Sequence, residues 1–204
     1  MAVSSFPNIQ AAADTVAEVV QNGVLVQCIE ILDDVMMKAI NQAESTTKGA
    51  RQWPEQPSLF FKFAGSEDQV KLDMKRTSEI VKKHKGTKLE TATSEAEKEA
   101  LWRARKVALW SALELLPGSR AWTTDVCVPM SQFPTLVAET KEDLDRLNVV
   151  APIVGHAGDG VSLIQLSVVS SDQANIILRI RTSTVSSCSE TTKNLHALKK
   201  EYIT

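Results

Sequence analysis

One short glycine-rich segment carries the side chains best suited to chemistry. In GHAGDG, residues 155–160, an imidazole and a carboxylate stand three residues apart at His156 and Asp159. Both groups are common ligands of divalent metals, and glycines let the backbone approach a ligand closely. A metal site needs at least two or three protein ligands, so the segment alone leaves a structural histidine as the alternative. His156 is the candidate metal ligand.

A second candidate is an arginine in a helical segment that is rich in tryptophan. The stretch LWRARK, residues 101–106, carries Arg103, Arg105 and Lys106, and Trp110 follows one turn later. A guanidinium that emerges from an apolar wall can bind a carboxylate through two hydrogen bonds. The alternative is a solvated basic face whose aliphatic stems cover apolar neighbours.

Helical and extended patterns alternate along the first 160 residues, and these elements must position the candidate side chains. Apolar residues at helical spacing, together with start and stop signals, predict helices over 8–23, 33–43, 66–85, 94–115 and 131–148. β-branched and apolar runs predict strands near 24–32, 58–65, 87–92, 119–128 and 150–157. Such alternation suits an α+β or an α/β fold, with helices on one face or both faces of a sheet.

Composition excludes several classes of protein. The 204 residues are 43% hydrophobic and 24% charged, which is typical of a globular chain. The net charge of -2 comes from interspersed acidic and basic residues, so no basic stripe indicates a nucleic acid or a membrane surface as partner. The three cysteines lie far apart, which argues against a disulfide framework. No apolar run approaches the roughly 20 residues of a membrane span, and MAVSSFPN has the features of no targeting signal.

Five segments together resemble a known family. They are IEILDDVMMKAIN, SLFFKFAGSEDQV, LWRARKVALW, TTDVCVPMSQFPTLVAETKEDLD and IVGHAGDG. Their order and spacing resemble the C-terminal half of the FAD-linked D-lactate dehydrogenases of the cytochrome type, within the vanillyl-alcohol oxidase superfamily. The resemblance covers about residues 5–160, and it implies a truncated α+β cap domain: an antiparallel sheet with helices mainly on one face.

The resemblance also implies a function for the parent protein. In this family a separate N-terminal domain binds FAD, and the cap closes over the flavin. Arg105 corresponds to the residue that binds the substrate carboxylate, and His156 corresponds to a ligand of a divalent metal. The implied reaction is oxidation of D-lactate, or another D-2-hydroxy acid, to the 2-oxo acid. Cytochrome c is the implied electron acceptor and the mitochondrion the implied location.

The sequence departs from the family pattern after Gly160. The family continues GHxGDGNFH, whereas Leu163 stands here at the position of the second histidine, and a later Gly-Glu-His-Gly motif is missing. We therefore divide the chain into a partial cap domain, residues 1–160, and a divergent tail, residues 161–204. Val161-Ser162 can be encoded by GTGAGT, a common intron start, so read-through of an intron is one hypothesis for the tail.

These departures predict that the isolated chain is inactive, because one metal ligand out of three cannot hold the metal usefully. Two alternatives stay open. The chain could be a non-catalytic interaction module, or the cap of a related dehydrogenase acting on glycolate or D-2-hydroxyglutarate. The form TTDVCVP, without a lysine before Asp125, favours lactate.

Overall fold

The computed structural model describes residues 1–47, 50–115, 125–126, 128–158 and 163–166. Within these residues seven strands form one sheet, in the order β4-β1-β3-β2-β6-β7-β5. Every neighbouring pair is antiparallel. The strands are β1 (Ala2–Ser5), β2 (Cys28–Leu32), β3 (Ser58–Lys62), β4 (Glu90–Thr91), β5 (Asp125–Val126), β6 (Ile153–His156) and β7 (Leu163–Leu166). The predicted α+β class with an antiparallel sheet is confirmed.

Five helices pack against this sheet in the described part of the chain. They are α1 (Ile9–Gln21), α2 (Asp34–Glu44), α3 (Glu67–Lys83), α4 (Glu95–Glu114) and α5 (Phe133–Arg146). A short 3-10 turn, η1 (Met130–Gln132), precedes the last of them. The predicted capping box begins α4: the Ser94 hydroxyl accepts from the Glu97 backbone, while the Glu97 carboxylate accepts from the Ser94 backbone. None of these described helices is long and apolar enough to cross a membrane.

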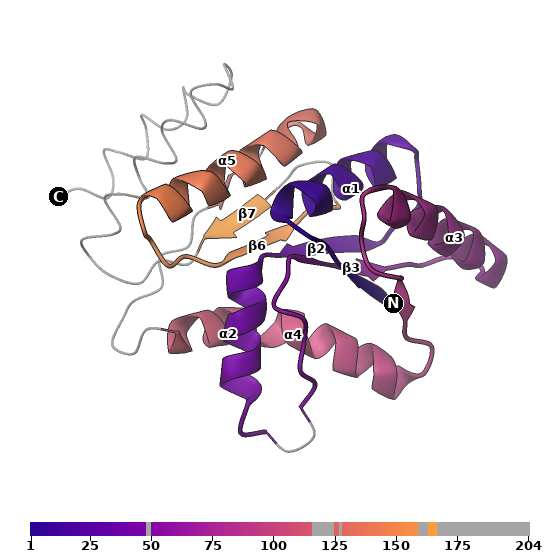
Figure 1. Ribbon diagram of the computed structural model, residues 1–204. Coiled ribbons are helices and arrows are strands. Elements are labelled where there is room, and N and C mark those ends of the chain that lie inside the picture. Colours follow the sequence, from indigo (N-terminus) through magenta and orange to yellow (C-terminus); the bar gives the residue numbers. More distant parts are fainter. Residues whose placement is uncertain (48–49, 116–124, 127, 159–162, 167–204) are drawn as a thin grey trace.

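The helices cover both faces of the sheet, which corrects the expectation that they lie mainly on one. Figure 1 shows α1, α3 and α5 on one side, and α2 and α4 on the other. The reason lies in the central strands, whose apolar side chains point both ways. Ile31 and Phe61 pack with the first group, whereas Leu32 and Phe60 pack with the second. A strand that is apolar on both faces needs cover on both.

The strand predictions differ from the structure mainly at the edges of the sheet. β1 was not predicted, because AVSS is short and has no apolar alternation, although all four of its residues are buried. β4 is only two residues long, where a strand over 87–92 was expected. β7 pairs with both β6 and β5, although it lies beyond the predicted domain boundary at residue 160.

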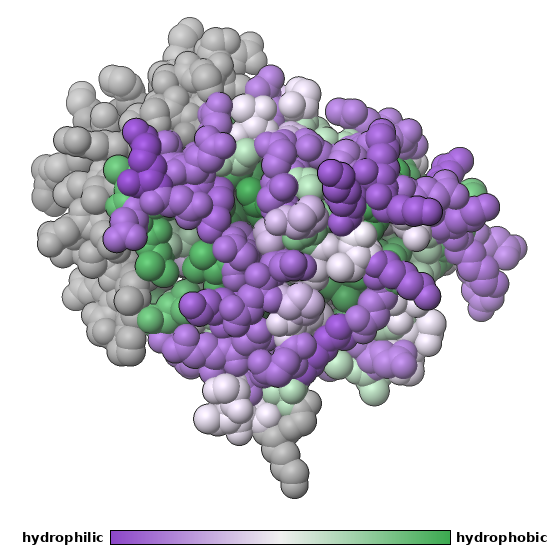
Figure 2. Space-filling view, in the orientation of Figure 1, coloured by the Kyte–Doolittle hydropathy of each residue, from purple (hydrophilic) through white to green (hydrophobic). Residues whose placement is uncertain are grey.

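The surface agrees with the mixed charge of the sequence. Figure 2 shows a mostly hydrophilic face on which apolar side chains lie in small separate groups. Exposed large apolar side chains within the described residues include Leu25, Leu72 and Trp110. Scattered apolar residues of this kind are normal for a globular protein.

Candidate functional site

The site is built where β2 and β6 lie side by side. Glu30 of β2 and His156 of β6 are register partners in the antiparallel pair, and such partners carry their side chains on the same face. Beyond β6, the Ala157 backbone N–H donates to the Ile29 carbonyl at 2.7 Å. A Cβ on Gly158 would lie 2.7 Å from the Ile29 nitrogen, so a glycine is required for the loop to pass this close to β2.

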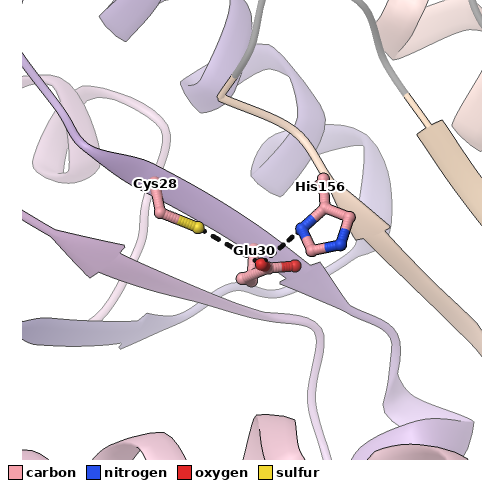
Figure 3. A group of neighbouring side chains, drawn as sticks. All are labelled: Cys28, Glu30 and His156. Carbon is pink, nitrogen blue, oxygen red and sulfur yellow. Dashed lines mark hydrogen bonds and ion pairs between the residues drawn. The ribbon is translucent and has the colours of Figure 1, made fainter.

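The Glu30 carboxylate is the centre of the site. Its side chain is only 2% exposed, and its Oε1 lies 2.5 Å from His156 Nδ1. Cys28 lies two residues before Glu30 and therefore on the same face of β2. Its Sγ donates to the same oxygen at 3.2 Å. Figure 3 shows the thiol and the imidazole approaching this carboxylate from opposite sides.

The second oxygen of Glu30 holds Arg105 of α4. The Arg105 Nε donates to Glu30 Oε2 at 2.9 Å, and Nη2 lies 3.3 Å from His156 Nε2. The buried face of α4 includes Leu101, Ala104 and Ala108. Arg105 lies next to this face and therefore beside the sheet, with a side chain 19% exposed. The buried negative charge of Glu30 is thus paired with a cation, as burial requires.

The hydrogen-bond partners fix the state of the imidazole. A guanidinium only donates, so Nε2 of His156 accepts from Arg105 and the proton lies on Nδ1, facing Glu30. This arrangement corresponds to a neutral histidine whose Nε2 lone pair points away from the Glu30 carboxylate. The His156 side chain is 46% exposed, so this edge of the ring is accessible.

Comparison with known proteins gives the family. The model for "FAD linked oxidases, C-terminal domain" matches residues 1–181. The chain belongs to the FAD-linked oxidases. The D-lactate dehydrogenase [cytochrome] of Kluyveromyces lactis is 42% identical over 165 residues, which are 78% of this chain and 28% of that protein. The corresponding Saccharomyces cerevisiae enzyme is 39% identical over the same shares. A glycolate oxidase subunit of Bacillus subtilis is 28% identical over 76% of this chain and 32% of its own length.

Solved structures agree on the fold of this FAD-linked oxidase C-terminal domain. An alkyldihydroxyacetonephosphate synthase superposes with a TM-score of 0.58 at 13% identity, over 98% of this chain and 41% of its own. A p-cresol methylhydroxylase gives 0.53 at 11% identity, over 91% and 42%. The chain spans only about a third or less of the curated relatives it matches.

The oxidase domain brings both predicted site residues together. Arg105 and His156 lie 51 positions apart in the sequence and are in contact, although their roles toward substrate and metal stay predictions. Asp159 lies outside the described residues. Arg103, the neighbouring candidate, instead pairs with Glu44 of α2 at 2.5 Å.

Sequence reasoning missed Cys28 and Glu30. A signal for Glu30 was present, because it is the one charged residue of the strand CIEIL and shares a face with the fully buried Leu32. An acid at such a position needs a partner. The sequence did not indicate that Arg105 and His156 are that partner.

The donors present suit a metal in part. A metal-binding histidine usually donates its other ring N–H to a carboxylate or carbonyl, which orients the ring. Glu30 Oε1 accepts in this way from Nδ1 of His156. The metal-ligand role of His156 stays a prediction, but Sγ of Cys28, a Glu30 oxygen and a His156 nitrogen lie within 4.8 Å of one another.

Proposed function

We propose that the parent protein of this domain oxidises a D-2-hydroxy acid, D-lactate in the first instance, to the 2-oxo acid. We further propose that electrons pass to cytochrome c and that the protein works in mitochondria, as the names of the two yeast relatives suggest. The 204-residue chain supplies part of the cap and is inactive alone. Identity to the D-lactate dehydrogenases well above that to the glycolate oxidase subunit favours lactate.

The observation that carries the proposal is the single buried carboxylate that holds both candidate residues. Glu30 binds Arg105 through Oε2 and His156 through Oε1. This leaves N–H groups on the two terminal nitrogens of the guanidinium for a substrate carboxylate. The Nε2 of His156 lies beside them and accepts from Nη2 at 3.3 Å, so a substrate hydroxyl or a cation would replace that hydrogen bond. A 2-hydroxy acid carries its hydroxyl on the carbon next to its carboxylate, which matches this juxtaposition.

Each group then has a defined role. Arg105 binds and orients the substrate carboxylate, and Glu30 holds the guanidinium in place and neutralises it. His156 presents Nε2 toward the hydroxyl side, either directly or as a ligand of a divalent cation that would lower the cost of removing the hydroxyl proton. FAD, when bound by its own domain, would accept the hydride equivalent from the substrate carbon.

A chimaera tests this proposal. Residues 1–158 replace the matching segment of the Kluyveromyces lactis relative, which keeps its own remaining sequence. We expect reduction of cytochrome c that depends on D-lactate and not on L-lactate, and that falls at least about a hundredfold in Arg105→Ala. A folded, flavin-loaded chimaera that does not turn over D-lactate overturns the proposal. Faster turnover of glycolate than of D-lactate overturns the choice of substrate.

The activity of the chain alone is tested separately. Purified 204-residue protein is assayed for a flavin spectrum and for dye reduction in the presence of D-lactate. We expect neither. Robust turnover by the isolated chain contradicts the proposal that it is an incomplete cap.

A further inference from the structure

We propose that Cys28, Glu30 and His156 form a binding site for a divalent cation of the zinc type, through Sγ, Oε1 and Nδ1. This site goes beyond the proposed oxidation and does not rest on it, and an ion bound through Nδ1 would exclude the role of the His156 Nε2 lone pair in that oxidation. It also differs from the metal site that the family resemblance implies, because two of its three donors come from β2. Neither Cys28 nor Glu30 belongs to the histidine motif.

The backbone brings the three donors together. Cys28 and Glu30 alternate onto one face of β2, and His156 is the register partner of Glu30 on the neighbouring strand. The donor atoms lie within 4.8 Å of one another, with Sγ 3.2 Å and Nδ1 2.5 Å from Glu30 Oε1. Ligands at zinc distances of about 2.0–2.3 Å in a tetrahedron lie roughly 3.3–3.6 Å apart. To enclose an ion, Sγ and Nδ1 would each move less than about 1 Å away from Oε1, and the thiol and the imidazole, which lie within 4.8 Å of each other, would approach.

The donor types select the class of cation. A thiolate with an imidazole and a carboxylate favours zinc or cadmium over magnesium or calcium, which prefer oxygen ligands. Binding releases the Cys28 thiol proton to solvent, and the His156 proton moves from Nδ1 to Nε2. The thiolate and the carboxylate then balance the two positive charges of the ion. Cys28 is half-buried and His156 is half-exposed, so a water can reach the fourth position.

Arg105 opposes this cation. Its Nε already holds Glu30 Oε2, and its Nη2 faces His156 Nε2. Once Nε2 carries a proton, two donors face each other, so the guanidinium must withdraw from the ring. Removing the arginine charge should therefore strengthen metal binding. This sign is specific to the proposed geometry, because a cation bound elsewhere on the surface would be indifferent to Arg105.

The test uses the purified 204-residue chain after treatment with a chelator. Cadmium is titrated while the ultraviolet thiolate-to-metal charge-transfer band is recorded, and zinc affinity is measured by competition with a chromophoric chelator. We expect one ion per chain. Cys28→Ser should abolish the band, whereas Cys127→Ser and Cys188→Ser, substitutions of the same type, should keep it.

Two further variants probe the other donors. His156→Gln and Glu30→Gln should each weaken zinc by about a hundredfold, while Glu44→Gln, at another buried glutamate paired with an arginine of α4, should not. Arg105→Met should tighten zinc several-fold. Circular dichroism checks the fold of each variant, and Cys28→Ser alone decides the outcome if Glu30→Gln fails to fold. A cadmium band that survives Cys28→Ser, or no binding by the wild-type chain, overturns the site.

Discussion

Leu163 of β7 lies directly opposite His156 of β6 in the antiparallel register. Position 163 is the one at which the family resemblance implies a second metal-binding histidine. Register partners share a face of the sheet, so a histidine placed at position 163 would stand beside His156. The sequence lacks this second imidazole as well as the later Gly-Glu-His-Gly motif.

Leu163→His should therefore strengthen binding of a divalent cation, for which Mn²⁺ serves as the probe. We expect its affinity for Mn²⁺ to rise on the order of tenfold, because a second imidazole joins His156. Isothermal titration of the purified chain measures the change. Ile164→His adds a histidine to the same strand opposite Gly155, on the other face of the sheet, and serves as the control. Equal affinities in the two variants would contradict the register argument.

The Glu30 carboxylate should matter more to stability than the similar Glu44. Glu30→Gln leaves Arg105, with 19% of its side chain exposed, without its anion, and we expect a loss of about 3 kcal/mol. Glu44→Gln affects Arg103, whose side chain is 54% exposed, and should cost about 1 kcal/mol or less. Urea unfolding of the two variants gives the comparison. If Glu30→Gln lowers the free energy of unfolding less than Glu44→Gln does, the contacts of Glu30 with Arg105 and His156 do not stabilise the fold.

The sequence predicted the elements whose patterns are local. SLFFKFAGS contains β3, because a nearly continuous apolar run marks a buried strand, and Ser94 with Glu97 marks the start of α4. β1 was missed because its four small residues become a strand by pairing with β3 and β4 on either side, which is a long-range effect. The helices on the second face, α2 and α4, pack against Phe60 and Leu32. The face toward which these two side chains point depends on strand register.

Only the site residues that belong to recognisable sequence motifs were predicted. His156 and Arg105 stood in recognisable segments, whereas Glu30 became important through a partner 126 positions away. Strand order decides that contact, because β2 lies beside β6 in the sheet and not beside β1. No periodicity in the sequence gives this order.

The boundary at residue 160 stays a proposal. β7 joins the sheet, and the family model continues to residue 181, so the first residues beyond the boundary fit this fold whatever their origin. Intron read-through predicts that genomic DNA and spliced transcript diverge at the Val161 codon. Sequencing both across codons 160–165 decides the question, and an uninterrupted reading frame in the transcript and in related loci would contradict the read-through hypothesis.

Asp33 should make the protein less stable as the pH rises through the mildly acidic range. The residue is fully buried, and burial raises its pKa from 3.8 to about 7, against the opposing effect of Lys141 on α5. The folded state therefore holds the proton more tightly than the unfolded state. Its stabilising contribution, at most about 4 kcal/mol, is complete below pH 3.8 and is lost between there and about pH 7.

Asp33→Asn should remove this dependence. The amide oxygen can still accept from the Met36 backbone N–H, as the carboxylate does at 2.8 Å, so the start of α2 is preserved. Urea midpoints measured across the range should fall less steeply with pH in this variant than in wild type. Asp34→Asn, at the neighbouring and more exposed position, is the control and should leave the slope unchanged. Parallel curves for wild type and Asp33→Asn would exclude Asp33 as the titrating group.

Gly158 should be required for both the fold and the site, and the two effects can be separated. A Cβ at this position would lie 2.7 Å from the Ile29 nitrogen, so the backbone must move away from β2 and carry His156 with it. We expect Gly158→Ala to cost about 1–3 kcal/mol and to weaken the cadmium thiolate band. Gly86→Ala is the matched control, because its Cβ would meet Phe6 and Val81 at 2.7 Å, which belong to the core cluster on the side of the sheet opposite α4. Gly86→Ala should lower the stability of the chain in urea but keep the cadmium thiolate band. Equal loss of the band in both variants would show that general destabilisation, and not the position of His156, controls metal binding.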